Sequence, residues 1–373
     1  MQNLLNIQQN EIVNTIKLLI YNENPNLLEK VNFEDNNVFL EPLLFAYFNL
    51  KNNNSTTTNL LNEIMQGYFI ENHTVLIDQL FIESEIVYLP KIGYFRKDDK
   101  LPFEKPCFIT NTGLEILKTN ISLLKNVFKN SKNEIVNADE IIIDDILYKK
   151  NIYFLTKALH LIKNNTPYQY NLIKLCCKKC MMFKSNAKDL NSFAALSAHG
   201  IAFFNVNQVD YNEVFFVDDI AHQTGHIILN TLFYQRKLIY KIDDNQNINQ
   251  IINIEDNRNF NTLFQALYTY YTTLLCLDDC FKSELLKEYQ KQEIKARIGF
   301  YLIKCKFDLT VFQDILLIFN GIENVLCQVG IDLYVLILNK YFKVFEKWNQ
   351  ITSNFNYDNQ TYNFSYSKFV KIN

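Results

Sequence analysis

Two histidines spaced one helical turn apart are the residues of this chain best suited to chemistry. His222 and His226 belong to the segment H-Q-T-G-H. On a helix, positions i and i+4 lie on one face, so two imidazoles with this spacing can hold one metal ion. Asp219 lies three residues earlier and can act as a third ligand or orient a ligand histidine. His199 and Tyr270 are further candidates for the third ligand.

The residue that follows the first histidine limits which metal-dependent reactions the motif can support. In metallopeptidases with an H-E-x-x-H motif, a glutamate at this position takes a proton from metal-bound water. Here the position holds Gln223, and an amide cannot take that role because it has no titratable oxygen. An ordinary zinc peptidase is therefore disfavoured. A non-haem iron(II) site needs two histidines, usually a carboxylate, and open positions for substrate and oxygen, but not that base.

Glycine and arginine are scarce in this chain, so their positions are informative. Gly225 falls inside the same expected helix, where glycine costs about 1 kcal/mol relative to alanine. We therefore expect another element to pack closely against the helix backbone at this point. Arg258 follows the histidine pair at the entry to another expected helix, and a guanidinium can bind a carboxylate through two parallel hydrogen bonds. The simpler interpretation of Arg258 is a surface salt bridge.

The order of these features resembles a known protein family. A strand, a turn of small residues, an H-E-x-x-H-like helix and an arginine-containing loop resemble the H-E-x-x-H-type 2-oxoglutarate-dependent peptide β-hydroxylases, which accompany pathways for ribosomally made, modified peptides. His222 and His226 match the paired metal ligands of that family, and Arg258 matches the loop arginine. Gln265 and Tyr268 match the pattern of the following helix. The resemblance covers about residues 197 to 281, and the glutamine after the first histidine departs from the family motif.

The resemblance implies an iron(II)/2-oxoglutarate-dependent oxygenase that hydroxylates a peptide or amino-acid side chain. Iron(II) and 2-oxoglutarate would be its cofactors, with Arg258 or Arg236 binding the distal carboxylate of 2-oxoglutarate. Two other interpretations remain open. One is a non-catalytic binding or scaffold protein in which both histidines are structural. The other is a zinc-dependent hydrolase with an atypical base, such as Asp219 or Glu213.

Composition argues against several other classes of protein. The 37 basic and 40 acidic residues leave a formal net charge of −3, which disfavours a general nucleic-acid binder. The glycine-rich fingerprints of dinucleotide and P-loop sites are missing. No run of 18 uncharged apolar residues predicts a membrane span, and residues 1–11 lack the basic start of a signal peptide. With eight cysteines expected to be reduced, these features favour a cytoplasmic protein. The partner is expected to be a peptide or small molecule, and oligomeric state stays open.

The pattern of apolar residues predicts a mainly α fold (α+β), a helical domain with a few short strands near the metal site and at the C-terminus. All prolines fall at or before Pro167, and beyond it apolar residues recur at three- and four-residue steps. We divide the chain into a mostly helical region of unassigned role, residues 1–170, and a helical domain that carries the histidine pair, residues 171–373. The two can also form one continuous domain.

Four segments carry more specific expectations. We expect a helix over residues 112–128, a strand over 201–206 and a long helix over 213–240. The tail over 355–371 alternates aromatic and polar residues, which predicts a hairpin or an edge strand.

Overall fold

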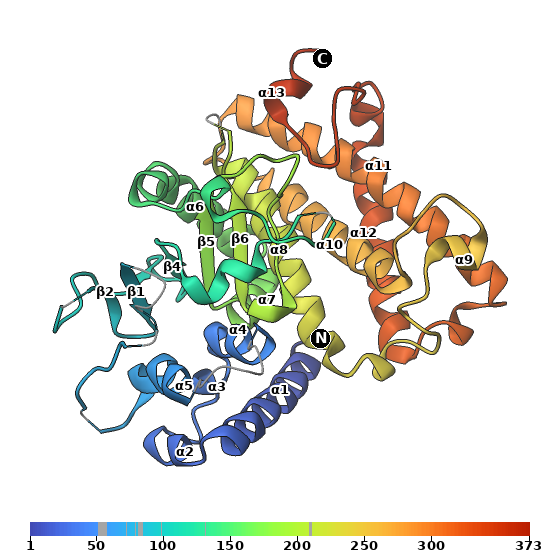
Figure 1. The fold of residues 1–373 in the computed structure, drawn as a ribbon. Coiled ribbons are helices and arrows are strands. Elements are labelled where there is room, and N and C mark those ends of the chain that lie inside the picture. The colour runs from blue at the N-terminus through green and yellow to red at the C-terminus, as the bar shows by residue number, and fades with distance from the viewer. Residues whose placement is uncertain are drawn as a thin grey trace. The chain divides into compact units, whose positions relative to one another are not determined.

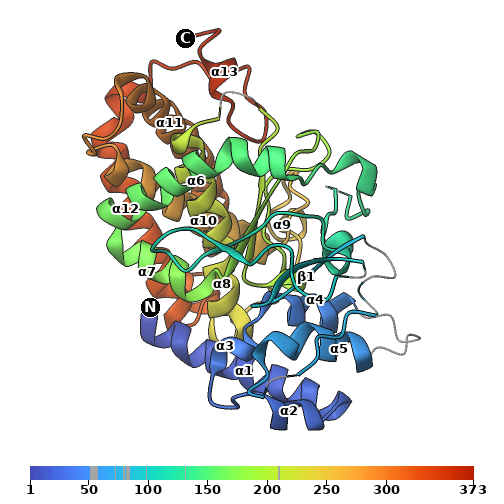
Figure 2. The same ribbon diagram turned by 90° about the vertical axis from the view of Figure 1, so that its left-hand side faces the viewer.

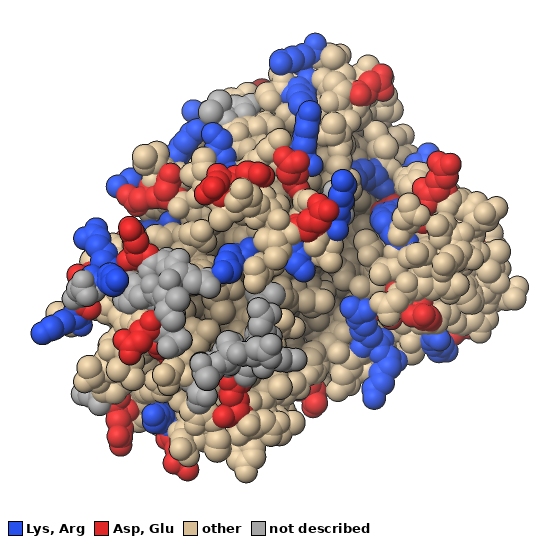
Figure 3. All heavy atoms as spheres, in the orientation of Figure 1, with Lys and Arg blue, Asp and Glu red and all other residues tan. Residues whose placement is uncertain are grey.

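The structure is a computed structural model that describes residues 1–50, 58–71, 73–78, 80, 85–97, 99–130, 132–208 and 211–373. These residues form a mainly helical protein, as predicted, with few and short strands (Figure 1). Within them, no helix is long and apolar enough to cross a membrane. On the face shown in Figure 3, acidic and basic side chains are intermixed, and neither sign forms a continuous patch.

The chain folds into two compact units, which are described separately below. Unit 1 comprises Met1–Tyr153 and Lys174–Val209, and unit 2 comprises Phe154–Ile173 and Asp210–Asn373. The division that the sequence suggested lay between residues 170 and 171, whereas here the chain changes unit three times. Two of these changes fall inside helices.

Unit 1 contains the strands of the described structure. A two-stranded antiparallel sheet pairs β1 with β2, and a four-stranded sheet has the order β3-β4-β5-β6. The pair β3-β4 is antiparallel, whereas β4-β5 and β5-β6 are parallel. The strands are β1 (Ile86–Leu89), β2 (Gly93–Arg96), β3 (Cys107–Phe108), β4 (Glu115–Leu117), β5 (Lys179–Phe183) and β6 (Ile201–Asn205).

The helices of unit 1 precede and flank these strands. They are α1 (Gln2–Glu23), α2 (Asn26–Lys30), α3 (Asn36–Phe39), α4 (Pro42–Leu50) and α5 (Thr58–Met65), with short 3₁₀ helices at Gln66–Tyr68, Ser122–Val127, Ala138–Glu140 and Leu196–Ala198. The helices α6 (Asp145–Asn165) and α7 (Pro167–Cys176) contain the points at which the chain changes unit. The strands β5 and β6 are buried along their whole length, and their aromatic side chains join one hydrophobic core with α1 and α4.

Unit 2 is helical throughout its described residues. Helices α8, α10, α11 and α12 pack against one another, and Figures 1 and 2 both show them side by side. The elements are α8 (Glu213–Leu232), α9 (Ile248–Ile252), α10 (Phe260–Cys280), α11 (Glu288–Ile318), α12 (Gln328–Thr352) and α13 (Tyr366–Phe369), with 3₁₀ helices at Phe233–Leu238 and Ile322–Asn324.

Side-chain caps explain where the helices of unit 2 begin. The side chain of Asn212 accepts a hydrogen bond from the Val214 N–H at the start of α8, at 2.7 Å. In the same way, Asn259 accepts from the Thr262 N–H at 2.8 Å and starts α10. Each cap satisfies one backbone donor that the first turn of a helix leaves free. Both asparagines can be located in the sequence as the polar residue that precedes an apolar run.

Some helices and strands were predicted correctly from local sequence patterns, and others were not. The predicted strand over 201–206 is confirmed as β6, and most of the predicted helix over 213–240 is confirmed as α8. The predicted helix over 112–128 is wrong, because this segment forms β4 and a 3₁₀ helix. Pairing of β4 with β5 outweighs the local preference, as tertiary context often does.

The strand expected at the C-terminus is not found among the described residues, whereas the strand expected before the histidine pair is β6 of unit 1. Residues 355–371 form turns and the short helix α13 instead of a hairpin. Their aromatic side chains pack on one another, as Phe364 does on Phe369 with ring centroids 5.6 Å apart, and on Phe300 of α11. Alternating aromatic residues can therefore bury their rings here without a partner strand.

Candidate functional site

The histidine pair lies on the face of α8 that runs along α10 and α11. The imidazole rings of His222 and His226 are 5.2 Å apart between centroids and meet at 71°. The predicted helical spacing therefore brings the two rings together. The site lies wholly within unit 2, since α8, α10 and α11 all belong to it.

A short chain of amide contacts orients His226. Its Nδ1 lies 3.2 Å from Oε1 of Gln265 on α10, and Nε2 of the same glutamine donates to Oδ1 of Asn230 at 3.4 Å. Because the carbonyl oxygen of Gln265 can only accept, this contact assigns the proton of His226 to Nδ1. The lone pair on Nε2 is then available to a ligand. Such an orienting contact to the second ring nitrogen is typical of metal-binding histidines.

His222 has an unsatisfied ring nitrogen. Its Nδ1 is buried and has no hydrogen-bond partner in the part of the chain that the structure describes. Burial, together with the neighbouring His226 and Lys304, lowers the pKa of His222 well below its usual value. Burial likewise lowers the pKa of His226 to about 4. Both imidazoles are therefore neutral at pH 7, the form in which histidine binds metals.

The three candidates for a third metal ligand occupy different environments. Asp219 is buried and accepts a hydrogen bond from Nε2 of Gln223 at 3.1 Å. The ring of Tyr270 lies 6.3 Å from that of His222, and burial raises the pKa of its phenol well above the usual value. His199 belongs to unit 1, where it packs on Phe45.

No side chain from these three completes a metal-binding cluster in the structure. Among the described residues, no three or more His, Cys, Asp and Glu side chains are grouped so that they could hold a metal ion. The group that the fold does bring to the histidine pair is the side-chain amide of Gln265. The sequence pattern indicated this residue only as part of a helix motif.

The close packing expected at Gly225 is confirmed. A Cβ atom at this position would lie 2.6 Å from Oγ1 of Thr272 and 3.3 Å from Cγ2 of Thr269, both on α10. The Thr272 hydroxyl donates to the backbone carbonyl of Ala221, one turn earlier on α8, at 2.9 Å. Glycine thus lets α10 approach α8 beside the two histidines.

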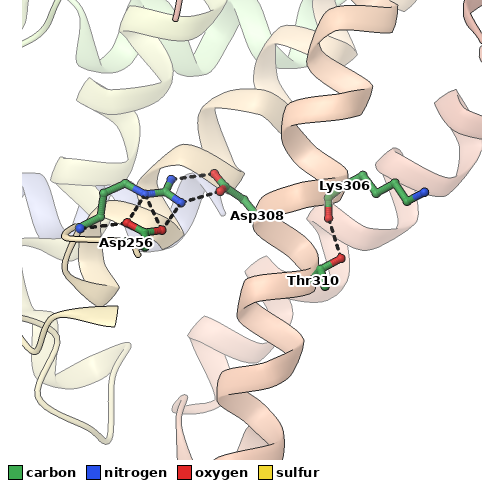
Figure 4. A network of polar contacts seen from close by, with 5 residues as sticks. Asp256, Lys306, Asp308 and Thr310 are labelled. Atoms are coloured by element: carbon green, nitrogen blue, oxygen red, sulfur yellow. Dashed lines mark hydrogen bonds and ion pairs between the residues drawn. The ribbon is translucent and has the colours of Figure 1, made fainter. Parts of the chain in front are cut away.

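Arg258 is held between two carboxylates (Figure 4). Its guanidinium makes bidentate contacts with Asp308 at 2.7 and 2.9 Å, and it also donates to Asp256 at 2.7 to 3.1 Å. Arg236 donates to Asp244 at 2.7 Å. The two arginines considered for binding the carboxylate of 2-oxoglutarate therefore both have internal carboxylate partners. At Arg258, a bound anion would meet the negative charges of two aspartates.

A polar face on α11 was missed in the sequence. Five residues of α11 spaced by three or four positions lie on one side of the helix: Glu293, Arg297, Tyr301, Lys304 and Asp308. In the structure one continuous helix carries all five residues beside α8 and α10.

Arg297 neutralises the acidic side chains at the N-terminal end of this polar face of α11. Its guanidinium is buried and contacts Asp218 of α8 at 2.7 Å and Glu293 at 2.7 and 2.9 Å. The Tyr301 phenol is also buried, with its ring 6.1 Å from that of His222. Burial and the charge of Asp218 raise the pKa of Tyr301 well above its usual value. Tyr301 is therefore a neutral hydroxyl group next to the histidine pair.

Comparisons with known proteins do not assign this chain to a family. No protein-family model matches it. No curated protein was found to be similar to it either. The candidate site is therefore interpreted from its own residues and geometry.

Proposed function

We propose that this chain is an iron(II)/2-oxoglutarate-dependent oxygenase that hydroxylates a peptide or amino-acid side chain. The observation that carries the proposal is the pair of neutral, half-buried imidazoles on one face of α8. Nδ1 of His222 has no partner in the described structure, and Gln265 assigns the free lone pair of His226 to Nε2. A buried nitrogen without a partner is costly, so its presence favours a ligand that satisfies it.

The donor set fits a divalent metal with positions left open. His222 and His226 would be the protein ligands, while Gln265 orients His226 through its Nδ1. Gln223 donates to Asp219, so the residue that replaces the peptidase glutamate has a structural role. This arrangement favours chemistry that needs no general base at that position over zinc-dependent hydrolysis.

The residues around the pair would exclude water and hold the reactants. Tyr270 and Tyr301 are buried and place neutral aromatic surfaces beside His222. When bound, iron(II) with 2-oxoglutarate and O₂ supplies the oxidation of a substrate C–H to C–OH, with release of succinate and CO₂. The close packing of α10 at Gly225 would keep the two imidazoles in fixed positions during turnover.

Metal binding by the full-length chain tests the proposal directly. We expect the purified protein, loaded anaerobically with iron(II) and desalted, to retain about one equivalent per chain. Replacing His222→Leu or His226→Leu should remove that iron and also abolish iron-dependent formation of succinate from 2-oxoglutarate. His160→Leu, the same substitution on α6 of the same unit, is the matched control and should retain the metal.

A non-catalytic protein with structural histidines is the second candidate. It is favoured by the absence of a complete ligand cluster of His, Cys, Asp and Glu among the described residues. The same measurement separates the two candidates. If the parent protein binds no iron(II), or if both histidine variants bind as much as the parent, the oxygenase proposal is wrong and the histidines are packing residues.

A further inference from the structure

Cationic side chains of unit 2 that are at least half-buried differ in whether they form an ion pair. Arg297 contacts Asp218 and Glu293, and Lys340 contacts Asp278 at 2.9 Å. Arg258 is paired with two aspartates in the same way. Lys304 lies on the same polar face of α11 as Arg297, but it forms no ion pair within the part of the chain that the structure describes. Lys304 is half-buried, and Asp308 and Asp218 act on its charge without contacting it. An ammonium group that is partly removed from water without an ion pair loses hydration, so this difference needs an explanation.

The surroundings of Lys304 hold its charge without neutralising it. The Nζ atom lies over three aromatic rings, at 4.1 Å from the centroid of Tyr362 and 5.4 Å from those of Tyr270 and Phe300. Contacts of this kind attract a cation but carry no net charge. The ammonium group has three N–H donors. It donates one to the backbone carbonyl of Tyr362 at 3.0 Å.

The ammonium group of Lys304 lies close to the histidine pair. One ring, that of Tyr270, contacts both the Lys304 amine and the imidazole of His222. The positive charge of Lys304 is also one of the causes that lower the pKa of His222. A ligand bound at the histidines would therefore lie within the electrostatic reach of an ammonium group that has donors to spare.

We propose that Lys304 binds the carboxylate of a small-molecule ligand that occupies the His222–His226 site. This inference rests on the proposed function and adds the residue that recognises the co-substrate, a role for which the sequence had indicated Arg258 and Arg236. A carboxylate would accept the remaining N–H donors of Lys304 and supply the missing negative charge. Burial lowers the pKa of Lys304 to about 8, so the amine is still mostly protonated at pH 7.

The C-terminal segment borders this carboxylate site. The Tyr357 hydroxyl donates to the backbone carbonyl of Ala296 on α11 at 2.9 Å, and Phe364 packs on Phe300. These contacts hold the segment over α11, where the Tyr362 carbonyl occupies one donor of Lys304. A carboxylate can share the ammonium group with this carbonyl, because an ammonium group has three N–H donors and the carbonyl accepts one of them.

Binding of 2-oxoglutarate to the full-length chain, measured by calorimetry, tests the inference. We expect Lys304→Met to weaken binding about 10- to 100-fold, the effect of removing one charge-assisted hydrogen bond from a buried site. Lys304→Arg should restore most of the affinity, because it keeps the charge. Arg236→Met, which removes a cation paired with Asp244, is the matched control and should bind like the parent.

The titrations are carried out both without metal and with one equivalent of manganese(II), a redox-stable substitute for iron(II). Folding of each variant is checked by far-UV circular dichroism and by the fluorescence of Trp348, the single tryptophan, which lies in unit 2. Equal affinity of the parent and the folded Lys304→Met protein would overturn the inference, as would no binding to the parent at millimolar concentrations.

The two proposals fail in different ways. If His222→Leu removes the metal but Lys304→Met leaves 2-oxoglutarate binding unchanged, the metal site stands and the carboxylate site is wrong. If the chain binds no metal but binds 2-oxoglutarate in a Lys304-dependent manner, the oxygenase proposal is wrong and the carboxylate site stands.

Discussion

Two lysines that are partly or wholly removed from water, buried Lys179 in unit 1 and half-buried Lys304 in unit 2, have different surroundings. In unit 1, Lys179 at the start of β5 lies 2.5 Å from Glu115 of β4 and 3.2 Å from Glu41. It also donates to the Tyr88 hydroxyl at 2.8 Å, and the Tyr68 hydroxyl donates to Glu41 at 2.6 Å. Charges and hydrogen-bonding groups in this cluster are matched by other residues of the chain.

Lys304 in unit 2 contacts aromatic rings and a carbonyl, and within the described residues it forms no ion pair with a carboxylate. The neighbouring His222 also has a nitrogen without a partner in the described structure. A cluster that satisfies itself stabilises the fold and has nothing left to offer a ligand. A cluster with unused donors contributes less to folding and is available for binding. The comparison therefore separates a structural centre from a candidate functional one.

Replacing each lysine in turn should give the largest difference in the free energy of unfolding between two variants. Lys179→Met would leave two buried carboxylates without their cation, and should lower the free energy of unfolding by about 3 to 5 kcal/mol at pH 7. Lys304→Met removes an unpaired charge and keeps an apolar stem, so we expect a change below about 1 kcal/mol. Urea unfolding followed by far-UV circular dichroism measures both variants against the parent.

The exposed pair of Lys149 with Asp145 supplies the control for these variants. Lys149→Met should be indistinguishable from the parent, because exposed ion pairs contribute little. Equal losses of stability for Lys179→Met and Lys304→Met would remove the distinction between the two centres.

The pH dependence of the free energy of unfolding tests whether unit 1 holds His199 in its neutral form. Burial lowers the pKa of this histidine to about 4, below the 6.5 of an ordinary histidine. The unfolded chain therefore binds a proton between these values and the folded chain does not. The free energy of unfolding should fall as the pH drops below 6.5, with about 2 kcal/mol from His199 lost between pH 6.5 and pH 5.

Comparison with His199→Leu isolates this contribution, since other groups titrate equally in both proteins. The difference in stability between parent and variant should change by that amount over the same pH range. A difference that stays constant with pH would show that His199 is protonated as easily in the folded protein as in the unfolded one.

Gly225→Ala is expected to have a modest effect on stability, because two contributions oppose each other. Alanine normally stabilises a helix relative to glycine by about 1 kcal/mol. Here its methyl group would lie 2.6 Å from Oγ1 of Thr272, and overpacking of that kind costs about 1 to 3 kcal/mol. We expect a net loss of about 1 kcal/mol, seen in the unfolding of unit 2 by Trp348 fluorescence.

The second variant for this test is Thr272→Ala. When it is combined with Gly225→Ala, the two effects should not add, because the methyl group then has room. Strict additivity, or a gain in stability from Gly225→Ala alone, would show that α10 does not press on α8 beside the histidines.

Local patterns in the sequence located the helices of unit 2 and the central feature of the candidate site. The i,i+4 spacing of His222 and His226 is sufficient to place both rings on one face, because a helix fixes that geometry by itself. Gly225 likewise indicated close packing, since a glycine inside a helix has a cost that another contact must offset.

Properties that depend on distant partners were not visible in the sequence. The pattern of Arg258 suggested an anion site, but only the folded chain brings Asp308, fifty residues away, onto its guanidinium. The helix predicted over 112–128 failed for the same reason, because β4 depends on pairing with β5.

The sequence by itself determined that His222 and His226 lie one turn apart on one helix face. Only the tertiary structure decided which cation near them forms no ion pair within the described residues. Whether a charged group is neutralised depends on residues that folding brings from other elements. Lys304 of α11 comes close to the site because α11 packs on α10. Spacing along one helix is local, whereas compensation of charge is a property of the assembled core.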